Sequence, residues 1–271
     1  MTIRLVSSFI LLPLFLIVLL VLPPIFTVIL VAAIAAVGSW ELLHGTGLVK
    51  NIRMCIYASI CGALTVFIGY FGLGYQWSLL MVLIFAVLVF VELMISNMQI
   101  GFDKAAVCLT GGLIVAFIFA SLARIRAGEH GKMIILLPFL ISFVSDSGAY
   151  FVGKFLGKHK LAPQISPKKT IEGAIGGVIA SILGMIIFCL IMQYFFAFNV
   201  NYFAACVYGA AGAVIGIFGD LSFSVIKRQT GIKDYGRVIP GHGGVLDRFD
   251  STFFITPVVE LLMIFWPVLV K

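Results

Sequence analysis

The chain has 271 residues, of which 62% are hydrophobic and only 11% are charged. Soluble domains are about half apolar and a quarter charged, so this composition excludes an ordinary soluble protein. The formal net charge of +7 does not indicate a nucleic-acid ligand, because the basic residues flank apolar runs and build no platform of basic and aromatic side chains. An anionic small molecule or a lipid headgroup is the expected partner.

Apolar runs as long as a membrane span follow one another along the chain. Since a bilayer core requires roughly 20 apolar residues per helix, the sequence predicts an all-α, polytopic integral membrane protein with about nine transmembrane helices. We expect two regions: 1–130, with about five helices, and 131–271, with about four helices whose ends are polar and rich in glycine. The expected spans are 5–22, 25–44, 53–72, 77–97, 105–123, 133–153, 171–197, 203–226 and 251–270.

The distribution of lysine and arginine orients these spans. An odd number of spans places the two termini on opposite sides of the membrane, and cytoplasmic loops are enriched in Lys and Arg. Of the 18 such residues, all but Arg124, Arg126, Lys132 and Lys271 fall on the side of the N-terminus. We therefore predict that the N-terminus and the long charged loops are cytoplasmic.

Small and polar residues within the spans are first interpreted structurally. The five cysteines lie in apolar runs without metal-ligand spacing, which indicates buried small side chains. Glycines four residues apart at Gly173/Gly177 and Gly212/Gly216 predict close helix packing in lipid. Each acidic residue in a span needs an explanation, because an isolated Asp near a helix centre costs about 3 kcal/mol on insertion scales.

Three acids show how these explanations differ. Glu41 ends the second expected span beside His44, where we expect it to reach interfacial water in a structural role. Glu92 and Glu260 are single acids in apolar surroundings, and an interhelical hydrogen bond and a functional role both stay open for them.

Two aspartates near cytoplasmic helix ends have polar neighbours. Asp146 lies in the stretch SFVSDSGAY, whose serines and tyrosine predict a wet cavity at the end of the sixth span. Asp220, Ser224 and Lys227 share one helix face at positions i, i+4 and i+7. An Asp–Lys pair that satisfies itself at the interface explains Asp220 and Lys227 equally well, but the stretch that follows favours a function.

The segment 219–250 interrupts the apolar pattern with glycines, cations and acids. Glycines at three of the four positions 241–244 let backbone amides approach a phosphate, and the helix N-terminus beyond them favours negative charge. Asp247 and Asp250, together with Asp220, supply hard oxygen ligands that suit Mg²⁺. The cations that suit phosphate oxygens here are Lys227, Arg228, Lys233, Arg237 and Arg248.

A second basic cluster precedes the seventh expected span. Its members are Lys154, Lys158, His159, Lys160, Lys168 and Lys169. A polybasic flank that follows the positive-inside rule is one interpretation. Ser166-Pro167 and the helix start at Lys168-Lys169-Thr170 favour a phosphate site at a helix terminus instead. Which of the two clusters binds lipid and which binds nucleotide stays open.

The spacing SxxKRxxxxKDxGxxxPxHGGxxDRxD, from Ser224 to Asp250, resembles the defining motif of the phosphatidate cytidylyltransferases, also called CDP-diacylglycerol synthases. The stretches SPKKTIEG from Ser166 and SDSGAYFVGKFLGKHKLAP from Ser145 are similar to that family as well. The resemblance implies a nucleotidyltransferase of phospholipid biosynthesis that converts phosphatidate and CTP into CDP-diacylglycerol and pyrophosphate with Mg²⁺. It also implies an integral protein of the bacterial cell (inner) membrane, a site that faces the cytoplasm, and a possible homodimer.

With this resemblance, each candidate residue receives an expected role. Asp220 and Asp247 are expected to hold the metal, with Asp250 and Asp146 assisting directly or through water. The expected catalytic set is Asp220, Lys227, Asp247 and Asp250. The expected substrate-binding residues are Asp146, Ser166, Lys168, Lys169, Ser224, Arg228, Lys233, His242, Gly243, Gly244 and Arg248.

Two other functions are compatible with parts of this pattern. A CTP-dependent lipid kinase would transfer the γ-phosphate to an alcohol and would require a positioned base, which the sequence does not reveal. A cation-coupled transporter would place its buried acids near the membrane midplane, whereas the candidate residues here gather at one face.

Overall fold

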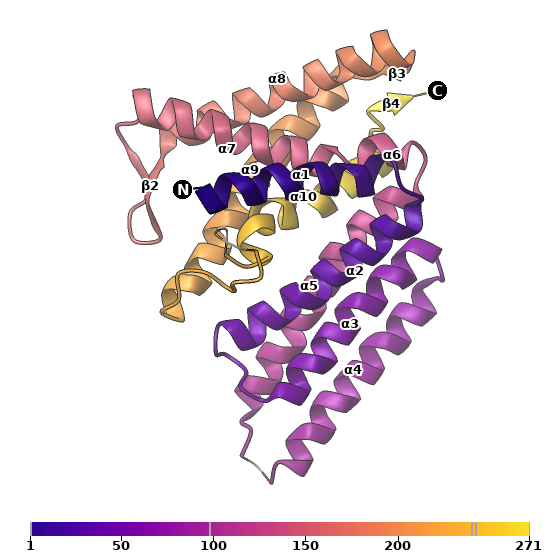
Figure 1. Cartoon of the computed structure of the whole chain (residues 1–271), viewed down its shortest axis with the longest axis vertical. Helices are drawn as coiled ribbons and strands as arrows, with labels where there is room; N and C mark the ends of the chain where they lie inside the picture. The colour runs from indigo at the N-terminus through magenta and orange to yellow at the C-terminus, as the bar shows by residue number, and fades with distance from the viewer. Residues whose placement is uncertain (1, 98, 240, 242, 271) are drawn as a thin grey trace. The chain divides into compact units, whose positions relative to one another are not determined.

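Long α-helices make up most of the structure (Figure 1). The computed structural model describes residues 2–97, 99–239, 241 and 243–270. The helices are α1 (Thr2–Leu20), α2 (Pro24–Trp40), the π-helix η1 (Glu41–Gly45), α3 (Ile52–Phe71), α4 (Tyr75–Ile95), α5 (Phe102–Ala127), α6 (Gly131–Ile134), α7 (Leu137–Leu156), α8 (Ile171–Phe196), α9 (Tyr202–Gln229) and α10 (Leu246–Phe265). Short strands β1 (Lys160–Ala162) and β2 (Ser166–Thr170) form one antiparallel pair, and β3 (Asn199–Val200) and β4 (Leu269–Val270) form another.

Seven helical segments of the described chain are long and apolar enough to cross a membrane, which confirms the polytopic all-α fold. The first expected span falls in α1, whose stretch Leu11–Leu20 is a shorter apolar helix. The last expected span falls in α10, which carries four charged residues in its sequence LDRFDSTFFITPVVELLMIF. The total of nine spans and the cytoplasmic N-terminus therefore stay predictions. The seven segments are Pro24–Gly45, Ile52–Phe71, Tyr75–Ile95, Phe102–Ala127, Gly131–Leu156, Ile171–Phe196 and Tyr202–Gln229.

The chain divides into two compact units. The first unit comprises Met1–Lys132 and Gln229–Phe249, so the loop 230–245 between α9 and α10 packs with the N-terminal helices. In this unit α2, α3 and α5 contact one another, and α4 lies against α3 and α5 (Figure 1). Its core contains Met54 and Phe85 together with three of the cysteines, and these cysteines are buried as predicted.

The second unit comprises Met133–Arg228 and Asp250–Lys271. Its most extensive helix contact joins α7 and α8, which the β1–β2 hairpin connects. A Cβ built on Gly177 would lie 2.8 Å from the backbone oxygen of Ser145, and one built on Gly216 would lie 2.8 Å from Cδ1 of Ile255. The predicted close packing at the glycine pairs is thereby confirmed.

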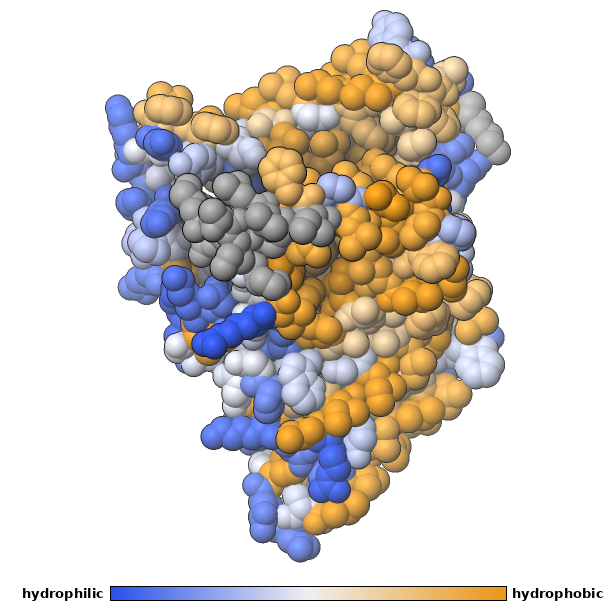
Figure 2. All heavy atoms as spheres, in the orientation of Figure 1, coloured by the Kyte–Doolittle hydropathy of each residue, from blue (hydrophilic) through white to orange (hydrophobic). Residues whose placement is uncertain are grey.

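The outer surfaces of both units are apolar where lipid is expected. On α8 the side chains of Ile175, Ile179, Leu183 and Ile187 repeat every four residues and are all exposed. Figure 2 shows apolar side chains over α8 and over the helices of the first unit, and hydrophilic side chains over the β1–β2 hairpin. Such continuous apolar surface suits hydrocarbon and not water.

Candidate functional site

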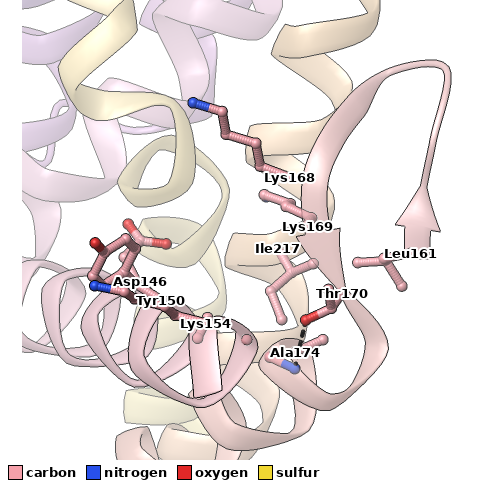
Figure 3. A pocket seen from close by; sticks show the side chains of 12 residues that line it. Asp146, Tyr150, Lys154, Leu161, Lys168, Lys169, Thr170, Ala174 and Ile217 are labelled. Carbon is pink, nitrogen blue, oxygen red and sulfur yellow. Dashed lines mark hydrogen bonds between the residues drawn. The ribbon is translucent and has the colours of Figure 1, made fainter. Parts of the chain in front are cut away.

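A cavity of about 300 Å³ opens within the second unit, between α7, α8, α9 and the β1–β2 hairpin. Figure 3 shows Asp146, Tyr150 and Lys154 on one side of this cavity and the hairpin residues on the other. A cavity is therefore present at Asp146, where the sequence predicted one. Cations and apolar side chains share its wall, which is lined by Asp146, Ala149, Tyr150, Gly153, Lys154, Leu161, Lys168, Lys169, Thr170, Gly173, Ala174 and Ile217.

The base of the hairpin is fixed to the first turn of α8. The carboxylate of Glu172 accepts the backbone N–H of Lys158 (3.1 Å) and of His159 (3.2 Å), and it lies 2.6 Å from Nδ1 of the His159 ring. The hydroxyl of Thr170 accepts the N–H of Gly173 at 3.1 Å and caps α8. Lys168 and Lys169 thus lie on strand β2, directly before the helix, which begins at Ile171 as the expected span 171–197 did.

The other end of the hairpin is held by α9. Nε of Arg228 donates to the backbone oxygen of Ile165, at 3.3 Å. Ser166, at the start of β2, is half-buried, and Lys168 is exposed. The hairpin therefore has contacts with its neighbours at both ends, which limits where its lysines can lie.

An ion pair links the hairpin to the acidic face of α9. Nζ of Lys169 lies 2.5 Å from Oδ2 of Asp220, and both side chains are about one-quarter exposed (25% and 26%). The hydroxyl of Ser224 donates to Oδ1 of the same aspartate at 3.3 Å, as expected for residues four apart on one helix face. Asp220 is therefore paired with a cation from the second basic cluster.

Three carboxylates from three helices gather in the second unit. Asp146 of α7 and Asp250 of α10 each lie within electrostatic range of Asp220. Lys169 also acts on Asp146, and Lys227 acts on Asp250. The second unit thus combines acids from the predicted metal and catalytic set with lysines from both basic clusters.

This donor set fits Mg²⁺ in its chemistry. Mg²⁺ prefers oxygen ligands, takes one or two protein carboxylates, and completes its octahedron with water and substrate phosphates. Within the described part of the chain, no three Asp, Glu, His or Cys side chains form a ready-made metal cage. Asp220 would hold the ion, with Asp146 or Asp250 beside it. The predicted partner Asp247 belongs to the first unit, so the pair of Asp220 and Asp247 stays a prediction.

Within the first unit, Asp247 organises the loop 230–245. Its side chain is buried, and Oδ2 accepts the backbone N–H of Tyr235 at 2.8 Å and of Gly244 at 3.0 Å. The N–H of Ile239 donates to the oxygen of Gly243 at 3.0 Å. These bonds fold the loop back on the first turn of α10.

A second carboxylate, from Glu41, also reaches this turn. Glu41 is only 2% exposed, and it accepts the N–H of Val245 at 3.0 Å and of Leu246 at 2.9 Å. The expectation that it reaches interfacial water is therefore wrong. The sequence predicted that the amides before and at the start of α10 bind a phosphate. In the structure, the N–H of Gly244 donates to Asp247, and those of Val245 and Leu246 donate to Glu41. An acid at the end of an apolar span was the only sequence signal of this contact, because its partners lie more than 200 residues away.

The buried acid Glu92 has a structural explanation. It is 2% exposed, accepts Nδ2 of Asn51 at 2.9 Å, and forms an ion pair with Nη2 of Arg53 at 2.8 Å. An interhelical hydrogen bond, one of the two explanations that the sequence allowed, is thus present between the start of α3 and the end of α4.

The other candidate residues are distributed over both units. His242 lies outside the described residues. In the second unit, Lys227 and Arg228 lie in the last turn of α9. In the first unit, Lys233 is exposed in the loop, Gly243 and Gly244 precede α10, and Arg248 is exposed in its first turn.

Comparison with known proteins places these observations in a family context. A family model described as the cytidylyltransferase family matches residues 2–266. A phosphatidate cytidylyltransferase of Staphylococcus haemolyticus is 42% identical over 170 residues, and one of Staphylococcus aureus (strain COL) is 44% identical over 170 residues. Each match covers 63% of this chain and 63% of the relative, so the chain spans less than two thirds of the length of the curated relatives it matches.

Proposed function

We propose a function for this chain from one premise, which is that it belongs to the cytidylyltransferase family. The proposed reaction transfers CMP from CTP to phosphatidate and yields CDP-diacylglycerol and pyrophosphate, as a step of phospholipid biosynthesis. The names of the staphylococcal relatives support this choice among cytidylyl transfers. The proposed place is the cytoplasmic face of the bacterial cell membrane, because the candidate residues gather at the ends of apolar helices where lysines and arginines are concentrated.

The observation that carries the proposal is the ion pair between Lys169 and Asp220. It joins the lysine-bearing hairpin to the cluster of Asp146, Asp220 and Asp250, so that groups suited to phosphate and groups suited to a divalent cation lie in one place. A reaction between two polyanions requires both kinds of group.

The proposed chemistry requires little of the protein besides positioning and charge. A phosphomonoester has its second pKa near about 6 and is mostly a dianion at neutral pH, so a phosphatidate oxygen is already a nucleophile. This oxygen forms a bond to the α-phosphorus of CTP while the bond from that phosphorus to the bridging oxygen breaks, and pyrophosphate leaves. No general base is needed, and the main barrier is the repulsion between the reactants.

The residues of the chain reduce that repulsion. Lys168, Lys169 and Lys154 place positive charge around the cavity, and Lys227 adds a cation beside Asp250. Asp220 would hold Mg²⁺, with Asp146 or Asp250 assisting. When bound, Mg²⁺ supplies positive charge to the phosphate oxygens and to the departing pyrophosphate.

We assign the cavity of the second unit to phosphatidate. Its wall joins lysines to apolar side chains such as Leu161, Ala174 and Ile217, a combination that suits a phosphate attached to hydrocarbon chains. Lys233, His242, Gly243 and Arg248 then stay as predicted contacts of CTP, whereas the amide of the buried Gly244 already donates to Asp247. Ser166, Ser224 and Arg228 stay predicted substrate-binding residues, and a homodimer stays a prediction from the family resemblance.

An assay with CTP labelled in its cytosine ring tests the reaction. The purified chain in detergent, given phosphatidate, labelled CTP and Mg²⁺, should move label into the organic phase and release pyrophosphate. Chelation of Mg²⁺ should stop the transfer, and added Mg²⁺ should restore it. Label that is recovered as soluble CDP would indicate transfer of the γ-phosphate instead of CMP, and absence of any turnover without an ion gradient would reject the proposed enzyme.

A further inference from the structure

The carboxylate of Glu41 has no role in the proposed chemistry, yet it is among the most buried charged groups described. It lies in the π-helix Glu41–Gly45 at the end of the second helix, far in sequence from every residue of the candidate motif. We propose that Glu41 is a positioning residue, which holds the loop 230–245 and the start of α10 in their shape before any substrate binds. The part of this inference that concerns activity rests on the proposed function.

The first support is the hydrogen bonding. The two oxygens of Glu41 each accept one amide from the entry of α10, that of Val245 at 3.0 Å and that of Leu246 at 2.9 Å. The amides at a helix start have no partners inside the helix, and the positive end of the helix dipole attracts a carboxylate. Charge-assisted bonds of this kind are stronger than neutral ones.

The second support is the packing of glycines around the same carboxylate. A Cβ built on Gly244 would lie 2.6 Å from each oxygen of Glu41, and a Cβ built on Gly236 would also collide with it. A Cβ on Gly45 would collide with the backbone oxygen of Tyr235. The loop therefore encloses Glu41 on several sides, and only residues without a side chain permit this approach.

The third support is the link from Glu41 to Asp247. The amides that Asp247 accepts, from Tyr235 and Gly244, belong to the same loop that encloses Glu41. A loop that moved away from Glu41 would change the surroundings of Asp247, which is a predicted catalytic and metal-binding residue. The π-helical turn at Glu41 is consistent with this, because such turns redirect side chains and are frequent at functional sites.

The test compares Glu41→Gln with Glu92→Gln in the full chain purified in detergent. Both residues are buried acids of the first unit with 2% exposure, but Glu92 contacts Asn51 and Arg53 and not the loop. The first readout is the initial rate of trypsin cleavage after the exposed Lys233 and Arg237, followed by mass spectrometry. The second readout is CMP transfer, with kcat and KM measured separately.

We expect Glu41→Gln to raise cleavage after Lys233 and Arg237 about tenfold or more, because the loop opens more often once the charge-assisted bonds are lost. Cleavage after Lys50 should stay at the wild-type rate, and kcat should fall about tenfold or more while KM changes less. Glu92→Gln should leave cleavage of the loop unchanged. Gly236→Ala, which crowds Glu41 without removing its charge, should reproduce the opening of the loop if Glu41→Gln gives too little folded protein.

Wild-type cleavage rates in the loop of both Glu41→Gln and Gly236→Ala would overturn the inference, as would equal opening of the loop in Glu92→Gln. A wild-type chain without CMP transfer would reject the proposed function, and the cleavage rates would still decide the role of Glu41.

Discussion

Glu172 and His159 lock the base of the β1–β2 hairpin, with 2.6 Å between a carboxylate oxygen and Nδ1 of the ring. The same carboxylate accepts the backbone N–H of Lys158 and of His159, which directly precede β1. One residue of α8 thus fixes the point where the hairpin begins. The lysines that the proposed function needs are carried by this hairpin. The geometry of the hairpin therefore depends on a residue of α8 that is not among the predicted substrate-binding residues.

Replacing Glu172 with Gln should weaken phosphatidate binding and leave most of the catalytic rate. The hairpin base loses its charged acceptor, so Lys168 and Lys169 sample more positions, and KM for phosphatidate should rise roughly threefold to tenfold with a smaller change in kcat. Steady-state kinetics in mixed micelles measure this. Asp103→Asn, which removes an exposed acid paired with Lys104, is the control and should be neutral.

Removal of the lysine that pairs with Asp220 should be more costly. Lys169→Ala should lower kcat/KM by roughly 100-fold, because it removes a cation next to the acid cluster and leaves Asp220 without its partner. Lys169→Arg should recover part of the loss. Lys104→Ala, which breaks a surface ion pair in the first unit, should have no effect. Activity within threefold of wild type in Lys169→Ala would reject the role of this pair.

Asp220→Asn and Asp247→Asn should both lower CMP transfer by roughly 1,000-fold or more, as expected for metal ligands. Their effects on the loop should differ. Asp247 accepts two loop amides, so its replacement should also accelerate trypsin cleavage after Lys233 and Arg237. Asp220→Asn should leave that cleavage at the wild-type rate. Identical loop protection in the two variants would show that the Asp247 carboxylate does not organise the loop.

Helix packing in the second unit predicts a stability difference between two glycines. A Cβ on Gly209 would lie 2.7 Å from the backbone Cα of Ile182, so Gly209→Ala must push α8 and α9 apart and should cost about 2 kcal/mol of stability. The three atoms nearest to a Cβ on Gly184 all belong to the side chain of Val144, and the first of them lies at 3.1 Å. Gly184→Ala should be neutral or gain up to about 1 kcal/mol from helix propensity. Thermal unfolding in detergent measures both, and equal melting temperatures would contradict the packing argument.

The sequence predicted well those features that depend on neighbouring residues. Apolar runs of sufficient length gave the helices, because the thickness of a bilayer sets the length of a span wherever it occurs. The shared face of Asp220 and Ser224 followed from helical spacing and is confirmed by their hydrogen bond. The cavity at Asp146 followed from a local cluster of polar residues at a helix end.

Contacts between distant segments were not predictable in the same way. The sequence pattern does not distinguish Lys169 from Lys168. Lys169 forms the ion pair with Asp220 because of the way β2 lies against α9, which the sequence does not reveal. The glycines near residue 244 were interpreted as space for a phosphate, whereas Glu41 fills that space. A glycine-rich turn permits an anion to approach its backbone closely, but it does not specify whether that anion is a phosphate or a carboxylate of the protein.

The separation of 204 residues between Glu41 and Val245 has a consequence for how the protein is made. A ribosome that adds about 5 to 20 residues per second completes the second helix roughly 10 to 40 seconds before the amides that Glu41 requires. During that interval the nascent chain carries the Glu41 carboxylate at the end of a helix without the backbone N–H groups that later donate to it. The first unit can therefore complete its fold around Glu41 only after the start of α10 has been synthesised.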